Sequence, residues 1–241
     1  MTSLRSAIAG AIAALALATA LPASKEARAD GLRCPARPGG AAAPAIRFEV
    51  FPPHVVYHHN VDILGLPSVG DTLERAPTGH YILGLTKNPT FVRLVDFRTV
   101  NLPLGDGRYC VWVTGVTAQM GDPREDVYIA ANYPEGSCEY DAVMRHENRH
   151  VAINLEGLRE WVPSVRAALS EAAARRFPVI ADSLGGGRQV GALLFDAVRP
   201  LFALMNEDLR RRNAAIDTPE SYRATQAECS NWFPRGTRPP R

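Results

Sequence analysis

The chain has 241 residues, of which 46% are hydrophobic and 22% charged, and these values are ordinary for a globular protein with one domain. Its formal net charge of +2 is too small to indicate binding to nucleic acid or to anionic membranes through overall charge. Beyond the N-terminal region no segment is long and apolar enough to span a bilayer, so no stable membrane insertion is expected.

Residues 1–29 have the pattern of a secretory signal peptide. Arg5 precedes an apolar run over residues 7–21, and Ala27-Arg28-Ala29 has the small-x-small form of a cleavage site. The run is shorter than a spanning helix, which favours cleavage over an uncleaved anchor. Cleavage would remove three of the 27 basic and one of the 25 acidic residues, which leaves 24 of each and no net charge. We therefore expect an exported protein, periplasmic or extracellular.

All four cysteines, Cys34, Cys110, Cys138 and Cys229, lie beyond the cleavage site. An even number in an exported chain predicts two disulfides, for which the sequence allows three pairings. None of the spacings is C-x-x-C, so a cysteine metal site or a thioredoxin-like motif is not expected.

Residues 30–45 are rich in Pro, Gly and Ala and predict an extended leader, after which residues 46–233 are expected to form a single domain. In residues 46–136, short runs rich in β-branched and aromatic residues alternate with turn residues. This half therefore predicts a mostly antiparallel, twisted sheet. The predicted strands are Ile46–Phe51, Val55–Tyr57, Tyr81–Leu85, Phe91–Val95, Cys110–Val116 and Val127–Ala130.

Residues 137–233 have helical signals, and residues 234–241 are expected to be a frayed tail. Ser137 is a good cap for a first helix to about Trp161, and Pro163 is expected to restart a second helix to about Phe177. A long helix follows from about Gln189 to Ile216, bent near Pro200, and Thr218-Pro219 starts a last helix towards Cys229. Strands first and helices second predict an α+β fold.

Residues 146–150 read His-Glu-Asn-Arg-His within the first predicted helix. With about 100° of rotation per residue, the two histidines lie about 40° apart and Glu147 lies about 100° from His146. All three fall on the apolar side of the helix, whereas the charged side chains, Arg149 among them, fall on the opposite side. Because buried carboxylates are normally paired or bound to metal, this placement indicates a metal ion.

Two histidines one helical turn apart direct their rings to one place, which is typical of zinc ligands. Glu147 follows the first histidine and is turned away from ligation. We therefore predict Zn²⁺ as the cofactor, His146 and His150 as its ligands, and Glu147 as the catalytic base that accepts a proton from the attacking water. The alternative is a core in which the three side chains are only hydrogen-bonded to other protein groups.

This segment resembles the signature of the zincin metallopeptidases, which places apolar and uncharged residues around H-E-x-x-H. Val143, Asn148, Val151 and Ala152 fit that signature, whereas Arg149 departs from it because the intervening positions are usually uncharged. The resemblance implies a zincin-like fold in which a sheet precedes the helix that carries the active site.

More narrowly, the chain is similar to a family of exported bacterial proteins described as zinc-dependent proteases of unknown function. The similarity rests on Cys138 before the motif, on Val151 and Ile153 after it, and on a late Asn-x-x-x-Asp-Thr segment from Asn213 to Thr218. It implies a zinc site and a hydrolytic role, and it identifies no substrate.

A catalytic zinc site needs a third protein ligand and one open position. Ile153 and Glu156 stand where a metzincin would have Gly and His, so that group of zincins is excluded. The remaining option is a carboxylate from a later helix, as in gluzincin-like enzymes. The sequence leaves Glu207, Asp208 and Asp217 open as candidates.

Two functions from different classes remain open. The first is a secreted or periplasmic zinc metallopeptidase whose sheet edge holds an extended peptide or protein substrate. The second is a non-catalytic exported module that binds a metal or a partner in the cell envelope. Access of substrate to the site and turnover of a peptide library distinguish them, and the oligomeric state is not indicated.

Overall fold

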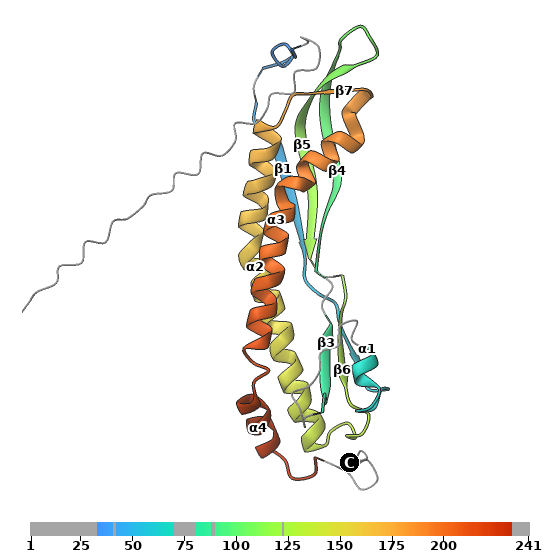
Figure 1. The fold of residues 1–241 in the computed structure, drawn as a ribbon, viewed down its shortest axis with the longest axis vertical. Coiled ribbons are helices and arrows are strands. Elements are labelled where there is room, and N and C mark those ends of the chain that lie inside the picture. Colours follow the sequence, from blue (N-terminus) through green and yellow to red (C-terminus); the bar gives the residue numbers. More distant parts are fainter. Residues whose placement is uncertain (1–32, 41, 70–80, 88–89, 122, 233–241) are drawn as a thin grey trace, which may run out of the picture. The chain divides into compact units, whose positions relative to one another are not determined.

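The computed structural model describes residues 33–40, 42–69, 81–87, 90–121 and 123–232. The chain divides into two units, residues 1–33 and 34–241, and all the elements below belong to the second unit. Its strands and helices make it an α+β protein, as the sequence predicts (Figure 1). The predicted signal peptide (1–29), part of the predicted leader (30–45) and the predicted tail (234–241) lie outside the described residues.

The first sheet has four strands and is built around β5, Tyr109–Gly121. β1 (Ala45–Phe51) runs parallel to β5, and β4 (Phe91–Pro103) runs antiparallel to it on the other side. β7 (Val179–Ala181) pairs antiparallel with the beginning of β5. β5 is mostly buried, because it is the central strand, with neighbours on both edges, and α2 contacts it.

The second sheet has three strands in the order β2-β6-β3. β2 (Val55–His58) is parallel to the central β6 (Glu125–Ile129), and β3 (Gly84–Lys87) is antiparallel to it. β3 was expected at Tyr81–Leu85 and lies slightly later in the chain. It forms one edge of the sheet, and no other strand of the described residues pairs with it.

The expectation of one mostly antiparallel sheet therefore needs correction, because there are two mixed sheets and each contains a parallel pair. β1 leads into β2 and β5 leads into β6, so two neighbouring segments pass together from the first sheet to the second. Pro52 and Pro53 interrupt the first segment because proline has no N–H for the ladder. At the end of β5 the segments approach closely, since a Cβ on Gly121 would lie 2.4 Å from the carbonyl oxygen of Phe51.

α2 is a single helix, Cys138–Arg175, and the hydroxyl of Ser137 caps it by accepting a hydrogen bond of 3.2 Å from the Tyr140 N–H. The predicted cap is thus confirmed, but the predicted break at Pro163 is wrong. An internal proline costs a helix about 3 kcal/mol. α2 nevertheless continues because its second half packs a buried stripe, Leu158, Val165 and Leu169, against the first sheet and α3.

α3 (Gly187–Ala214) follows a short 3₁₀ turn, Leu184–Gly186, and packs along α2. It contains Pro200, and Figure 1 shows it changing direction along its length, as predicted. α4 (Pro219–Ala227) begins at the predicted cap, where the Thr218 hydroxyl accepts from the Ser221 N–H at 3.2 Å. The short helix α1 (Leu66–Val69) and strand β7 were not predicted, because each is too short to show a hydrophobic period.

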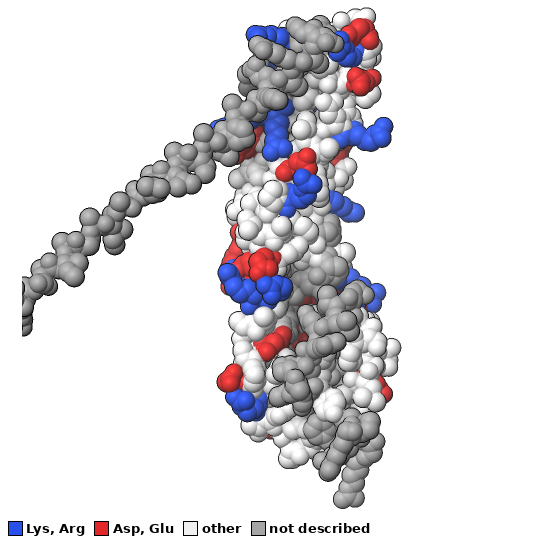
Figure 2. Space-filling view, in the orientation of Figure 1, with Lys and Arg blue, Asp and Glu red and all other residues white. Residues whose placement is uncertain are grey.

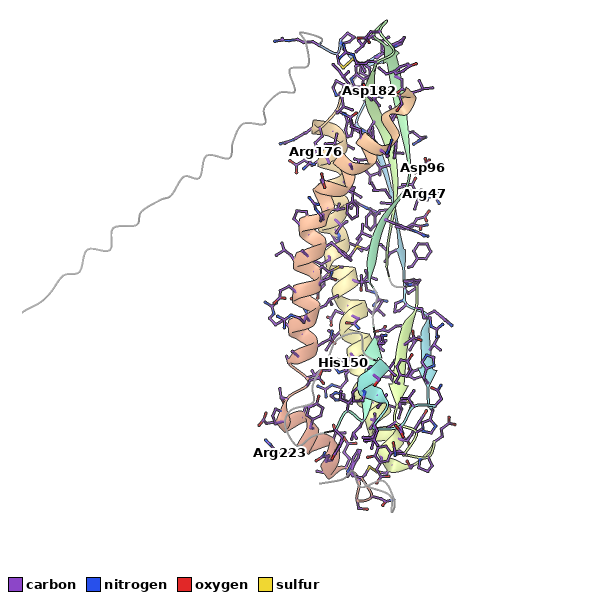
Figure 3. All side chains as sticks on the ribbon, turned by 45° about the vertical axis from the view of Figure 1, so that its right-hand side comes forward. Arg47, Asp96, His150, Arg176, Asp182 and Arg223 are labelled. Atoms are coloured by element: carbon purple, nitrogen blue, oxygen red, sulfur yellow. A yellow bond between two sulfur atoms is a disulfide. The ribbon has the colours of Figure 1, made fainter. Side chains whose placement is uncertain are left out.

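Two clusters of buried side chains form the core. The larger joins the first sheet to α3 and to the second half of α2, where Leu158 and Val165 lie. The smaller joins the second sheet to the first turns of α2, through Ala142 and Val143, and to Trp232 near the end of the described chain. The His-Glu-Asn-Arg-His segment lies on α2 between the two clusters. Figure 3 shows His150 at the level of the second sheet, whereas Arg47 and Asp96 lie at the level of the first.

The surface carries both charge signs in close proximity. On the face shown in Figure 2, basic and acidic side chains lie next to one another. Ion pairs of the described residues include Arg210–Glu207 and Arg212–Glu160. None of the helices in the described part of the chain has the length and apolar character needed to cross a membrane.

Candidate metal centre

α2 brings the polar residues of the motif into the interior of the protein. His146, Glu147 and His150 are 8%, 4% and 8% exposed, although all three side chains can carry charge. Arg149 is exposed, as the helical periodicity predicts. The amphipathic pattern therefore placed these side chains on the correct face of the helix, and their burial requires partners.

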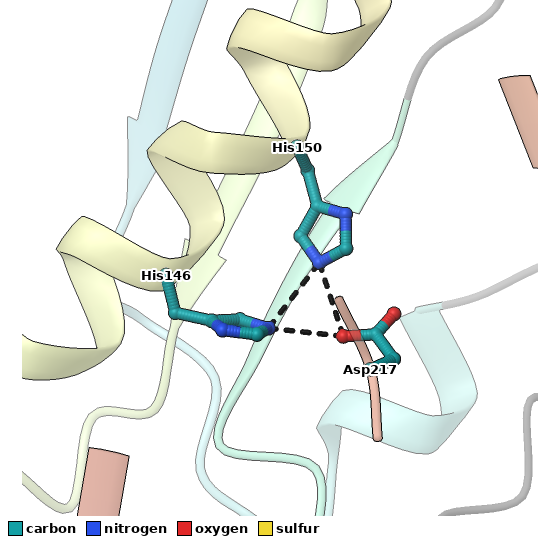
Figure 4. Close-up of side chains that lie close together, drawn as sticks. All are labelled: His146, His150 and Asp217. Carbon is teal, nitrogen blue, oxygen red and sulfur yellow. Dashed lines mark hydrogen bonds and ion pairs between the residues drawn. The ribbon is translucent and has the colours of Figure 1, made fainter. Parts of the chain in front are cut away.

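Asp217 provides the partner, from the connection between α3 and α4. α3 ends at Ala214, and Asp217 stands directly before Thr218, the residue that caps α4. Its Oδ1 atom lies 2.9 Å from Nε2 of His146 and 3.2 Å from Nε2 of His150, and the two Nε2 atoms are 3.3 Å apart (Figure 4). Among the described residues, these three side chains form the group of potential ligands that could hold a metal ion.

The spacing of these three atoms matches a tetrahedral metal site. Ligand atoms bonded at about 2.0–2.2 Å to one tetrahedral zinc ion stand about 3.3 Å apart. The observed separations of 2.9, 3.2 and 3.3 Å are close to this value. Two imidazole nitrogens and one carboxylate oxygen are also a donor set that zinc accepts in catalytic sites. The residues present therefore fit a divalent ion, although they do not identify which one.

The other carboxylates that the sequence left open take part in different interactions. Glu207 is exposed and forms an ion pair with Arg210 at 2.6 Å. Asp208 accepts a hydrogen bond from the Trp161 ring N–H at 3.3 Å and pairs with Arg212 at 2.9 Å. Neither carboxylate is part of the group formed by His146, His150 and Asp217.

Hydrogen bonding and charge set the protonation of this group. Burial opposes a charge on His150, but the hydrogen bond to Asp217 and the charges of Glu147 and Asp217 raise the pKa of His150 to about 9. Burial would raise the pKa of Asp217, yet hydrogen bonds from the two histidines hold it well below its usual range. Near neutral pH and without a metal, His150 therefore keeps a proton that it shares with the carboxylate of Asp217. A cation bound between these side chains would displace that proton.

Glu147 is held beside the three potential ligands by strand β3. The Thr86 hydroxyl donates a hydrogen bond of 2.8 Å to Oε2 of Glu147. Gly84 leaves room for the carboxylate, because a Cβ at that position would lie 2.4 Å from Oε1. Burial raises the pKa of Glu147, and the nearby charge of His150 partly opposes this rise. A carboxyl group with a raised pKa is suited to accept and release a proton near neutral pH.

The sequence did not single out Thr86 or Gly84, because a hydroxyl and a glycine in a short strand carry no pattern that links them to a distant helix. Asn213 was noted only as the first residue of the Asn-x-x-x-Asp-Thr segment. Its Oδ1 atom lies 2.7 Å from Nδ1 of His150, so it contacts the ring nitrogen that faces away from Asp217.

A pocket of about 620 Å³ opens onto the three potential ligands and Glu147. One wall is strand β3 with the residues before it, the floor is α2, and the other wall comes from the end of α3 and from α4. Its lining combines apolar side chains with the polar groups described above, which is typical of ligand sites. The larger apolar side chains among them are Ile82, Leu83, Leu85, Val143 and Leu209.

Two disulfides are present, Cys34–Cys110 and Cys138–Cys229, which selects one of the three pairings that the sequence allowed. Such bonds are compatible with an exported protein. Cys138 is the first residue of α2 and Cys229 follows α4, so this bond ties the segment after Asp217 to the helix that carries both histidines.

Replacing Cys138 and Cys229 together by Ala is expected to lower the free energy of unfolding by about 2–5 kcal/mol and to weaken metal binding. The metal effect arises because Asp217 loses a covalent anchor that holds its segment near α2. Denaturant unfolding and competition with a chelator for Zn²⁺ measure the two effects.

The matched control replaces Cys34 and Cys110 by Ala. This bond spans 76 residues against 91 for Cys138–Cys229, so the expected loss of stability is similar. Its zinc affinity should be unchanged, and an equal loss of affinity in both double variants would contradict the proposed anchoring role.

Comparisons with protein-family models, with curated proteins and with solved structures found no match to this chain. The resemblance seen in the sequence thus rests on the motif and its surroundings, and the fold and the site are assigned from the chain itself.

Proposed function

We propose that the protein is an exported, zinc-dependent hydrolase that cleaves peptide or amide bonds. The observation that carries this proposal is the convergence of His146, His150 and Asp217 in the lining of a pocket that Glu147 also lines. Three ligands leave one coordination position open, and such an open position separates catalytic zinc sites from structural ones.

When bound, the zinc ion would supply Lewis acidity that polarises a substrate carbonyl and makes water more acidic. The chain supplies the proton transfers. Glu147 lines the same pocket as the three ligands and accepts a proton from the attacking water on its carboxylate. Because Thr86 donates a hydrogen bond to Oε2 of Glu147, we assign this transfer to Oε1. Glu147 then delivers the proton to the leaving amine.

Strand β3 offers a way to bind an extended substrate. The N–H of Ala130 donates to the carbonyl of Leu83 at 2.9 Å, so Leu83, Leu85 and Lys87 direct their backbone groups towards β6. The backbone groups of Gly84 and Thr86 consequently point to the outer edge, where no strand of the described residues pairs with them. A peptide that adds to this edge would pass the open side of the metal centre.

The test combines metal analysis with a cleavage assay. Protein purified from an exporting host without added zinc is expected to contain close to one zinc ion per chain. It should cleave members of a peptide library, and a chelator should stop the cleavage until Zn²⁺ is restored. Absence of bound metal contradicts the proposal. Bound metal without turnover would instead favour a non-catalytic metal-binding module.

Gly84→Ala should disturb the position of Glu147. The added methyl group would lie 2.4 Å from Oε1 of Glu147 and 2.7 Å from a methyl group of Val143, so the carboxylate or strand β3 must move. We expect cleavage to fall by about 10–100-fold, because misplaced catalytic groups lose rate steeply, and stability to fall by about 1–3 kcal/mol. Steady-state kinetics and thermal unfolding measure both changes.

Gly191→Ala is the matched control. A Cβ on Gly191 would find its nearest atom 4.0 Å away on Phe97, and the residue lies inside α3. Because Ala favours a helix by up to about 1 kcal/mol over Gly, this variant should be at least as stable as the unchanged protein. Its cleavage activity should also be unchanged, and unchanged activity in Gly84→Ala would contradict the role given to strand β3.

A further inference from the structure

A line of hydrogen bonds leads from His150 to a buried carboxyl group on β6. Oδ1 of Asn213 lies 2.7 Å from Nδ1 of His150, and Nδ2 of Asn213 donates to Oδ1 of Asn154 at 2.9 Å. Nδ2 of Asn154 then donates to Oε1 of Glu125 at 2.7 Å. The three residues come from α3, α2 and β6, so the line connects three elements behind the metal centre.

The direction of this line is determined at both ends. Nδ2 of Asn213 also donates to the backbone carbonyl of Leu209 at 3.0 Å, and a carbonyl can only accept. The amide oxygen of Asn213 must therefore face His150. At the far end, Oε1 of Glu125 accepts from Asn154, which turns the amide oxygen of Asn154 towards Asn213.

The direction of these hydrogen bonds determines which ring nitrogen of His150 carries a hydrogen. Since the amide oxygen of Asn213 can only accept, Nδ1 of His150 must carry a hydrogen and donate it. Nε2 of a neutral His150 then presents its lone pair towards Asp217 and His146, as a metal ligand must. His146 differs, because its Nδ1 atom is buried and has no hydrogen-bond partner among the described residues.

The packing around Glu125 does not explain why this position holds a carboxylic acid. It is 0% exposed, and its Oε2 atom has no hydrogen-bond partner in the described part of the chain. Burying such a group is costly, and an apolar side chain of similar size would fill the space more favourably. Burial raises the pKa of Glu125, yet Oε1 accepts from Asn154 whether or not Oε2 holds a proton.

We propose that Glu125, Asn154 and Asn213 are positioning residues that fix His150 as its Nδ1–H tautomer and thereby strengthen zinc binding. The inference rests on the metal centre of the proposed function and is independent of which bond that centre hydrolyses. Partners that orient metal-binding histidines typically contribute 10–100-fold to metal affinity.

The test uses the full mature chain, with Zn²⁺ alone as the probe. In the zinc-bound protein, ¹H–¹⁵N spectra should show a slowly exchanging proton on Nδ1 of His150. Asn213→Leu should remove this protected signal and weaken zinc binding by about 10–100-fold, measured by chelator competition. Glu125→Met should weaken it by roughly tenfold, the lower end of that range, because Glu125 acts through two amides.

Glu125→Gln is the conservative variant, and it should retain zinc affinity because its amide oxygen can still accept from Asn154. Glu139→Met is the matched control for a buried carboxylate. Glu139 is 5% exposed and accepts from the Asn231 N–H at 2.7 Å, so its loss should lower stability without changing zinc affinity.

Two results would overturn the proposal: a zinc-bound protein whose His150 carries no proton on Nδ1, or equal zinc affinities in Glu125→Met and Glu139→Met. A protein that binds zinc with the expected pattern of affinities but cleaves no peptide would leave this inference standing. In that case only the proposed hydrolytic function would fail.

Discussion

Glu147→Gln is expected to lose most of its cleavage activity while zinc stays bound. The amide keeps the shape of the side chain and can still accept from the Thr86 hydroxyl, but it cannot take a proton from water. Loss of a general base typically lowers kcat by about 10²–10⁴-fold. Zinc content should remain close to one ion per chain, since Glu147 is not among the three potential ligands. Steady-state kinetics with metal analysis of the same sample measure both properties.

Glu156→Gln is the control for this prediction. It makes the same chemical change on the same helix, but Glu156 is exposed and lies on the opposite face. Activity should therefore be unchanged. If Glu147→Gln retained normal cleavage, the carboxylate would not be the base, and if it lost zinc, Glu147 would have to be assigned as a ligand.

Asp217→Ala is expected to have the largest effect on metal binding. It removes the oxygen that lies 2.9 and 3.2 Å from the two histidine nitrogens, which leaves two ligands for a metal that needs three. The expected loss of zinc affinity is on the order of 10³-fold, beyond the 10–100-fold typical of residues that only orient a ligand. Competition with a chelator of known affinity, followed by cleavage assays at saturating Zn²⁺, measures this loss.

Asp208→Ala is the matched control, because the sequence alone also allowed Asp208 as the third ligand. Asp208 pairs with Trp161 and Arg212 and is not part of the group formed by His146, His150 and Asp217, so its loss should leave zinc binding and cleavage unchanged. Equal zinc affinity in Asp217→Ala and the unchanged protein would exclude the proposed site, provided that circular dichroism shows both proteins folded.

The sequence and the structure agree where the deciding interaction is local. Ser137 and Thr218 cap the helices they were expected to cap, because a cap is a contact between residues three positions apart. His146, Glu147 and His150 share one buried face because helical geometry sets their directions. The presence of two disulfides was also expected, from the number of cysteines alone, whereas their pairing is not local and was left open by the sequence.

The disagreements have a common origin in packing. Pro163 should end a helix by its own chemistry, yet the buried stripe of α2 outweighs that cost. β7 consists of three apolar residues and forms only because β5 offers an unpaired edge next to it. The parallel pairing of β1 with β5 also joins residues about seventy positions apart, and no short pattern encodes such a register.

By itself, the sequence determined the α+β order of elements, the face of α2 that is buried, and the two histidines and the glutamate on that face. Only the tertiary structure selected Asp217 from three possible carboxylates, placed Thr86 against Glu147 and joined Glu125 to His150 through two amides. The physical reason is that helical periodicity is set by neighbouring residues, whereas these contacts join residues about sixty or more positions apart, or cross from one element to another. Such contacts exist only after the helices and sheets have packed together.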